Sequence, residues 1–179
     1  MSMIKYVLEN GLKANIWIND FPNIIKEVKY ELLVEENTET YTNSKQLVVE
    51  LFIPRLHNNY ALLGIDFISD YQNKIKIKMS IENQQKLKNN HSLALSFDKV
   101  TWGILEEYKQ GVIDSLHMFL QNRELPSGTI NYNIAAYGEI GSSQAIFEIV
   151  SNILLSLLLN ENICEDTALT IVKKYVGIT

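Results

Sequence analysis

The segment from Ala145 to Leu159, "AIFEIVSNILLSLLL", places the strongest constraint on how this chain can fold. Its large apolar residues recur at the spacing of one helical face: Ile146, Ile149, Val150, Ile153, Leu154, Leu157 and Leu158. Phe147, Leu155 and Leu159 widen the apolar surface around the helix. The segment is shorter than a bilayer span and is interrupted by Glu148, Ser151, Asn152 and Ser156, so we expect no membrane association. It therefore needs cover on several sides, either from the rest of the chain or from a second copy in a homo-oligomer.

The first half of the chain predicts a sheet that can supply this cover, because its apolar residues alternate with a period of two. "IKYVLEN" and "LKANIWIN" flank Asn10-Gly11, a dipeptide typical of hairpin turns. Further strands are predicted at about 27–35 and at "QLVVELFIP". We expect "YALLGIDFISD" and "KIKIKMSI" to pair through a turn at "YQN". A later strand is predicted from the alternation of Ile130, Tyr132, Ile134 and Ala136.

Helical spacing extends from Lys99 to about Asn122. Gly103 and Gly111 fall inside this stretch and each costs about 1 kcal/mol relative to Ala, so the helix can break or kink near either. "EDTALTIVKKYV" predicts a closing helix, with Asp166 or Thr167 as its N-cap and Gly177 as its stop.

The order of these elements predicts an α+β fold. We expect an N-terminal, mainly antiparallel sheet of hairpins, C-terminal helices packed on one face, and one strand between two of the helices. "SLALSF" is interpreted as a short strand and "IENQQKLKNNH" as a polar connection. Residues 1–179 are predicted to form a single domain. If this domain divides into two lobes, residues 82–91 are the candidate boundary between them.

Composition narrows the class of protein further. A single cysteine, Cys164, excludes an internal disulfide, and together with the absence of a visible secretory signal it predicts a cytoplasmic protein. The formal charge of −5 argues against a general nucleic-acid binder, so we expect contact with nucleic acid only through the ribosome.

The sequence shows no catalytic constellation. His57, His91 and His117 are widely separated, and the spacings typical of zinc sites and nucleophile elbows do not occur. We therefore predict no catalytic residue, no metal and no cofactor, and an enzyme is the less favoured class.

The stretch "YGEIGSSQAIFEIV" places a glycine- and serine-containing turn between a strand and a helix. Backbone N–H groups at such a turn can bind a phosphate, which makes Gly138, Gly141, Ser142 and Ser143 candidate ligand-binding residues. However, Glu139 would repel an anion, and the segment lacks the lysine of a phosphate-binding loop. The favoured interpretation is that Ser142 or Ser143 caps the helix.

Candidate interaction residues lie in three other places. Trp17 sits among asparagines on one face of its strand, where it is either covered by a later element or a contact residue. An acidic connection contributes Glu35, Glu36 and Glu39. A basic strand face carries Lys74, Lys76 and Lys78, and is interpreted as a solvated face, as an edge strand protected by lysines, or as a site for an acidic partner.

Residues 102–158 resemble part of the fourth domain of bacterial elongation factor G and its ribosome-protection relatives. The resemblance rests on "GVIDSL", "INYNIAAYG", the Ser142-Ser143 pair and Phe147, which occur at similar spacing. Glu139, Ile140 and Gly141 stand where the family has a histidine and an acidic residue, and the family's GTP-binding domain is absent. The resemblance implies an αβ sandwich with a ribosome-like or other macromolecular partner, and it assigns no functional residue.

These observations favour a non-catalytic bacterial interaction protein, such as an adaptor, a regulatory subunit or an acidic immunity protein that neutralises a basic toxin. A protein partner is expected. The alternatives are a small-ligand-binding protein or enzyme that uses the Gly138–Ser143 turn, and a ribosome-associated protein.

Overall fold

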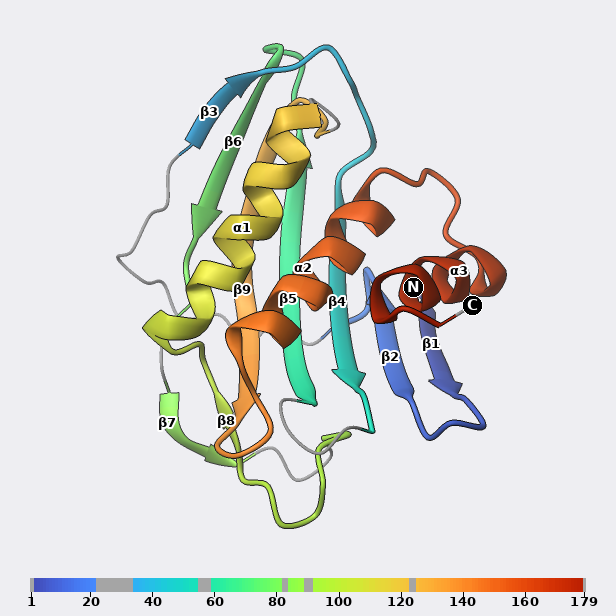
Figure 1. The fold of residues 1–179 in the computed structure, drawn as a ribbon. Helices are drawn as coiled ribbons and strands as arrows, with labels where there is room; N and C mark the ends of the chain where they lie inside the picture. Colours follow the sequence, from blue (N-terminus) through green and yellow to red (C-terminus); the bar gives the residue numbers. More distant parts are fainter. Residues whose placement is uncertain are drawn as a thin grey trace.

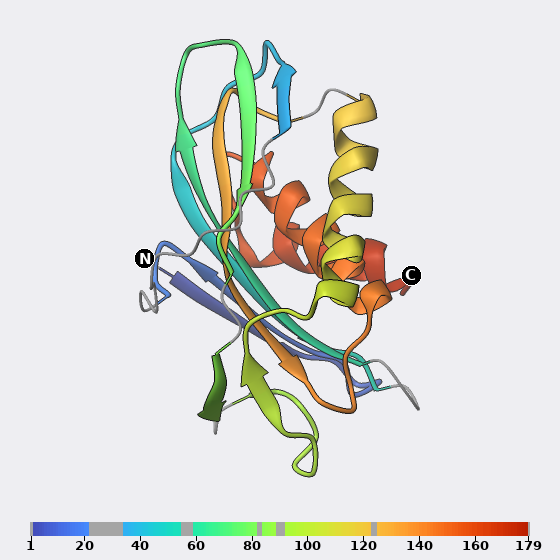
Figure 2. The ribbon, with the colours of Figure 1, turned by 90° about the vertical axis from the view of Figure 1, so that its left-hand side faces the viewer.

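A computed structural model of the chain describes residues 2–21, 34–54, 59–81, 84–88, 92–122 and 125–178. These residues form one twisted sheet with three helices on one of its faces (Figure 1, Figure 2). The arrangement confirms the predicted α+β class. The strand predicted at about 27–35 lies mostly outside the described residues.

The sheet has nine strands, and its main path runs in the order β1-β2-β4-β5-β9-β6-β3. Strand β8 pairs with the C-terminal end of β9, and β7 pairs with β8. The β6–β9 pair is parallel and the other pairs are antiparallel. The strands are β1 (Ser2–Val7), β2 (Lys13–Ile18), β3 (Val34–Asn37), β4 (Lys45–Phe52), β5 (Tyr60–Ser69), β6 (Lys74–Met79), β7 (Gln84–Lys88), β8 (Val100–Trp102) and β9 (Gly128–Gly138).

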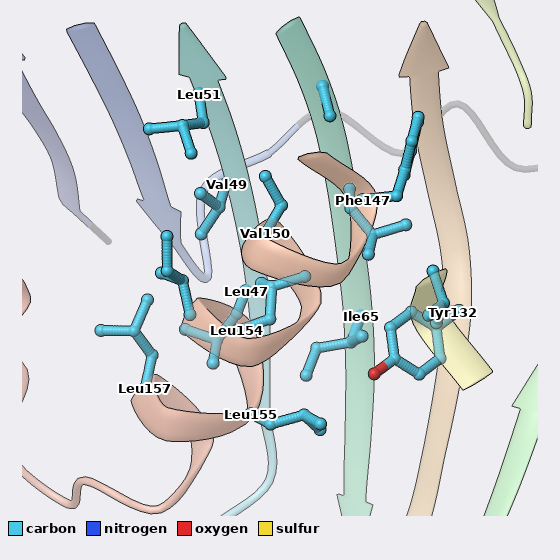
Figure 3. Packing of buried hydrophobic residues seen from close by; sticks show 14 of the residues in the cluster. Leu47, Val49, Leu51, Ile65, Tyr132, Phe147, Val150, Leu154, Leu155 and Leu157 are labelled. Carbon is cyan, nitrogen blue, oxygen red and sulfur yellow. The ribbon is translucent and has the colours of Figure 1, made fainter. Parts of the chain in front are cut away.

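The main core lies between the sheet and helix α2 (Gln144–Leu158). Figure 3 shows Leu47, Val49 and Leu51 of β4 pointing toward the same helix face as Ile65 of β5 and Tyr132 of β9. The predicted apolar stripe of α2 is covered within the chain, because helix α1 (Glu106–Asn122) packs beside it and helix α3 (Glu165–Val176) flanks its other side (Figure 1). The stripe therefore supplies no argument for a homo-oligomer, which stays a prediction. Among the helices that the structure describes, none combines the length and apolar character needed to cross a membrane.

A second, smaller core lies on the opposite face of the sheet. Its members are Val48, Tyr60, Leu62, Val100, Ile134 and Ala136. Trp17, Phe21 and Trp102 pack over this cluster, with the Trp17 and Phe21 rings edge to face and their centroids 5.1 Å apart. Strand alternation explains the division, because successive residues of β4 and β5 point to opposite faces.

A bulge in β9 divides its apolar residues between the two cores. Gly64 pairs with Ile134 and Ile65 pairs with Tyr132, so Asn133 is an extra residue on β9. The strand predicted from Ile130 to Ala136 is confirmed. However, Tyr132 faces the helices whereas Ile134 faces the second core.

The predicted pairing of β5 with β6 is wrong, because β9 lies between them. The turn between β5 and β6 contains Asn73 with φ 55°, yet the two strands diverge and each pairs with β9. A local turn signal cannot show that a strand from much later in the chain occupies the gap.

Four other element predictions also need correction. "SLALSF" is not a strand, whereas Gln84–Lys88, predicted as connection, forms β7. The long helix begins at Glu106 because Gly103 adopts φ 117°, which a helix does not accommodate, and Val100–Trp102 forms β8 instead. Helix α3 has Cys164 as its N-cap in place of the predicted Asp166 or Thr167, whereas Gly177 ends it with φ 75° as predicted.

Gly111 allows helices α1 and α2 to touch through their backbones. A Cβ atom at this position would lie 2.1 Å from the carbonyl oxygen of Gln144, which is much closer than van der Waals contact allows. The glycine therefore has a packing role that outweighs its low helix propensity.

We predict that Gly111→Ala lowers the free energy of unfolding by about 3 kcal/mol, because the helices must separate. At an exposed helix position the same change would raise stability by about 1 kcal/mol. Urea denaturation measures the difference, with Gln110→Ala as the control at a neighbouring exposed position. A Gly111→Ala protein as stable as the wild type would contradict this account of the helix contact.

Candidate functional site

The turn between β9 and α2 binds an internal anion, the side-chain carboxylate of Asp98. The carboxylate of Asp98 accepts hydrogen bonds from the N–H groups of Ile140 (2.9 Å) and Gly141 (2.8 Å). Asp98 is only 9% exposed. The backbone donors that made this turn a candidate phosphate site therefore bind a buried carboxylate from more than 40 residues earlier in the chain.

The two glycines of the turn make room for Asp98. A Cβ atom would lie 2.1 Å from Asp98 Oδ2 if placed at Gly138 and 2.5 Å from it if placed at Gly141. Nearby, Glu139 forms an ion pair with Lys99 at 2.6 Å. The turn is therefore shaped around this internal carboxylate.

The two serines of the turn also have internal partners. Ser142 Oγ donates to the carbonyl oxygen of Tyr60 (2.6 Å) and accepts from the N–H of Gly138 (2.9 Å). Ser143 is the N-cap of α2, and its Oγ accepts from the N–H of Ile146 (3.4 Å). The capping prediction is confirmed for Ser143, and ligand binding by the turn stays a prediction.

A second buried carboxylate, that of Glu50, lies on the face of the sheet that points away from the helices, and Glu50 is 2% exposed. Glu50 accepts from the Tyr60 hydroxyl (3.0 Å), from the Leu93 N–H (2.9 Å) and from the Asn15 side-chain amide (2.9 Å). Burial, followed by the adjacent Glu50 charge, raises the pKa of Tyr60 well above its ordinary value. These bonds hold the segment around Leu93 over the second core. Sequence reasoning missed both carboxylates, because their partners are distant in the chain.

The predicted acidic and basic residues meet at one side of the sheet. Strand β6 lies between β9 and β3, so it is not an edge strand. In the β3–β6 register Glu35 is opposite Lys76. Lys74 is exposed and Lys78 is partly buried on the same face of β6, while Glu36 on β3 and Glu39 beyond it are exposed.

Large apolar side chains are exposed at the end of the molecule where β5 leads into β6. Tyr71 is 85% exposed, Ile68 is 65% exposed and Tyr41 is 44% exposed. The two tyrosine rings are in contact, with centroids 5.4 Å apart and planes 33° apart. We call Tyr41, Ile68 and Tyr71 the tyrosine surface. It lies at the top of Figure 1, where the β3–β4 connection passes the end of β5.

Hydrogen bonds join the three connections that carry or support the tyrosine surface. The hydroxyls of Thr38 and Thr40 both donate to the carbonyl oxygen of Leu125, at 2.6 and 2.8 Å. Ser127 Oγ donates to Asp70 Oδ1 at 3.0 Å. The Tyr41 hydroxyl donates to the side-chain oxygen of Asn73. The surface is therefore held in place by hydrogen bonds within the chain.

A cleft of about 370 Å³ lies between the β3–β4 connection and the α2–α3 connection. Lys45 lines it, and burial lowers the pKa of this lysine while Glu161 opposes the shift. Cys164 also lines the cleft and is exposed. A hydrogen bond from the Thr167 hydroxyl, followed by one from the Thr167 backbone, lowers the pKa of the Cys164 thiol. Within the part of the chain that the structure describes, no three His, Cys, Asp or Glu side chains are grouped as metal ligands.

Comparison with protein-family models, with curated proteins and with solved structures finds no match to this chain.

We predict that Asp98→Ala lowers the free energy of unfolding by about 2–4 kcal/mol, because a part-buried N–H group and a buried N–H group lose a charged acceptor. Hydrogen exchange at Ile140 and Gly141 should accelerate in the same variant. Glu139→Gln is the control in the same turn, because its exposed ion pair with Lys99 contributes little to stability. Equal losses in the two variants would show that Asp98 does not organise the turn.

We predict that Thr167→Val raises the pKa of Cys164, because the thiolate loses the Thr167 hydroxyl hydrogen bond. The pH midpoint of the rate of alkylation by iodoacetamide should then shift upward. Thr170→Val is the control, since the Thr170 hydroxyl donates to the carbonyl oxygen of Asp166 and not to the thiol. A midpoint that is the same in all three proteins would rule out this hydrogen bond as the cause.

Proposed function

We propose that the protein is a non-catalytic, cytoplasmic protein-interaction protein, in the class of adaptors, regulatory subunits or immunity-type inhibitors. The observation that carries this proposal is the tyrosine surface, in which two aromatic rings and an isoleucine face solvent on a hydrogen-bonded support.

Exposed tyrosines on a fixed support are well suited to binding a protein. Tyrosine is enriched among the residues that dominate interface energies. Its ring offers a large contact area and loses little conformational entropy on binding, because it has few rotatable bonds. The mutual contact of Tyr41 and Tyr71 restricts both rings further. A partner would therefore bind a surface that is already organised.

The alternative of a small-ligand site in the Gly138–Ser143 turn has weaker support. The N–H groups of Ile140 and Gly141 already donate to Asp98, and the hydroxyl of Ser142 already bonds to Tyr60 and Gly138. A phosphate would have to displace a buried carboxylate to reach these donors.

The proposal predicts that tagged wild-type protein, purified from the cells that produce it, retains a stoichiometric protein partner. The double variant Tyr41→Ala/Tyr71→Ala should lose this partner, because it lacks the aromatic contact area. Size-exclusion chromatography with light scattering and mass spectrometry of the eluted complex measure the loss.

The control is Phe97→Ala/Ile140→Ala, which removes exposed apolar side chains at the other end of the molecule and should keep the partner. Strictly monomeric wild-type protein without a partner would contradict the proposed function. Recovery of ribosomes in place of one protein would favour the ribosome-associated alternative.

A further inference from the structure

Two carboxylates are close in the chain to the two tyrosines of the tyrosine surface. Glu39 precedes Tyr41 by two residues and is exposed, and Asp70 directly precedes Tyr71. Glu36 is exposed on the adjacent strand β3. Lys74 is exposed at the start of β6 and offsets part of this negative charge. The region remains acidic, in keeping with the formal charge of −5 for the whole chain.

The exposed face of Tyr71 adds a second reason to expect a cation. A guanidinium or ammonium group placed over a tyrosine ring is attracted by the negative π face. Arginine suits the site better than lysine, since its planar group can stack on a ring and bond a neighbouring carboxylate at the same time. Asp70 is held next to Tyr71 by the bond from Ser127 and by a bond from the N–H of Gln72 (3.1 Å).

From these observations we infer that the tyrosine surface docks an arginine-rich segment of a basic partner protein, with a guanidinium group over the Tyr71 ring and the carboxylates of Glu39 and Asp70 supplying the attracting charge. This inference rests on the proposed function and specifies the partner's chemistry. A nucleic acid could also stack on the rings, but its phosphates would meet the same carboxylates and be repelled.

The test measures the fluorescence anisotropy of labelled oligoarginine, oligolysine of the same length, and oligothymidine against the full chain at physiological ionic strength. Wild-type protein should bind oligoarginine more tightly than oligolysine and should not bind oligothymidine. Tyr71→Ala should weaken oligoarginine binding about fivefold, whereas Tyr71→Phe keeps the ring and should retain it.

A matched pair of charge variants tests the location of the site. Glu39→Gln should weaken oligoarginine binding more than Glu9→Gln, which removes an equally exposed carboxylate in the β1–β2 connection at the opposite end of the molecule (Figure 1). All of these positions are exposed, so unchanged urea midpoints should confirm that the variants are folded.

The inference is overturned if Tyr71→Ala binds oligoarginine like the wild type, if Glu9→Gln weakens binding as much as Glu39→Gln, or if oligothymidine binds more tightly than oligoarginine. Failure of the proposed function is a separate result. If the wild-type protein and Tyr71→Ala retain the same partner equally well, the protein is still an interaction protein. That result rules out docking at Tyr71.

Discussion

The burial of helix α2 against the sheet is the interaction on which the rest of the structure depends. The helix is apolar around most of its circumference, and complete burial of each large aliphatic side chain contributes roughly 1.5–3 kcal/mol. Strands β4, β5 and β9 cover one side of α2, while α1 and α3 cover the others. Because α1 approaches the N-terminal turn of α2 through Gly111, the position of one helix fixes the position of the other.

Two buried carboxylates hold the connections that the apolar core leaves unsupported. Asp98 binds the turn that leads into α2, and Glu50 binds the segment that covers the opposite face of the sheet. A buried charge is costly unless hydrogen-bond donors surround it, and in both cases backbone N–H groups are among the donors. The same arrangement satisfies the donors that would otherwise be available to an external anion.

The tyrosine surface differs from these internal contacts because its apolar side chains face solvent. Tyr41 lies in the β3–β4 connection, Ile68 near the end of β5 and Tyr71 in the β5–β6 turn. The connection at Leu125 supports the β3–β4 connection through hydrogen bonds from Thr38 and Thr40. Exposed aromatic area on a fixed support is a feature of binding surfaces.

The sequence by itself determined the elements whose signals are local. The spacing from Ile146 to Leu158 specified α2, Asn10-Gly11 specified the first hairpin, and Gly177 specified the end of α3, because each depends on the conformational preferences of neighbouring residues. Only the tertiary structure decided that β9 separates β5 from β6, that Asp98 occupies the Gly138–Ser143 turn, and that Tyr41 meets Tyr71. These contacts join residues 30 or more positions apart. Their formation depends on how the whole sheet assembles, and no local spacing in the sequence encodes that assembly.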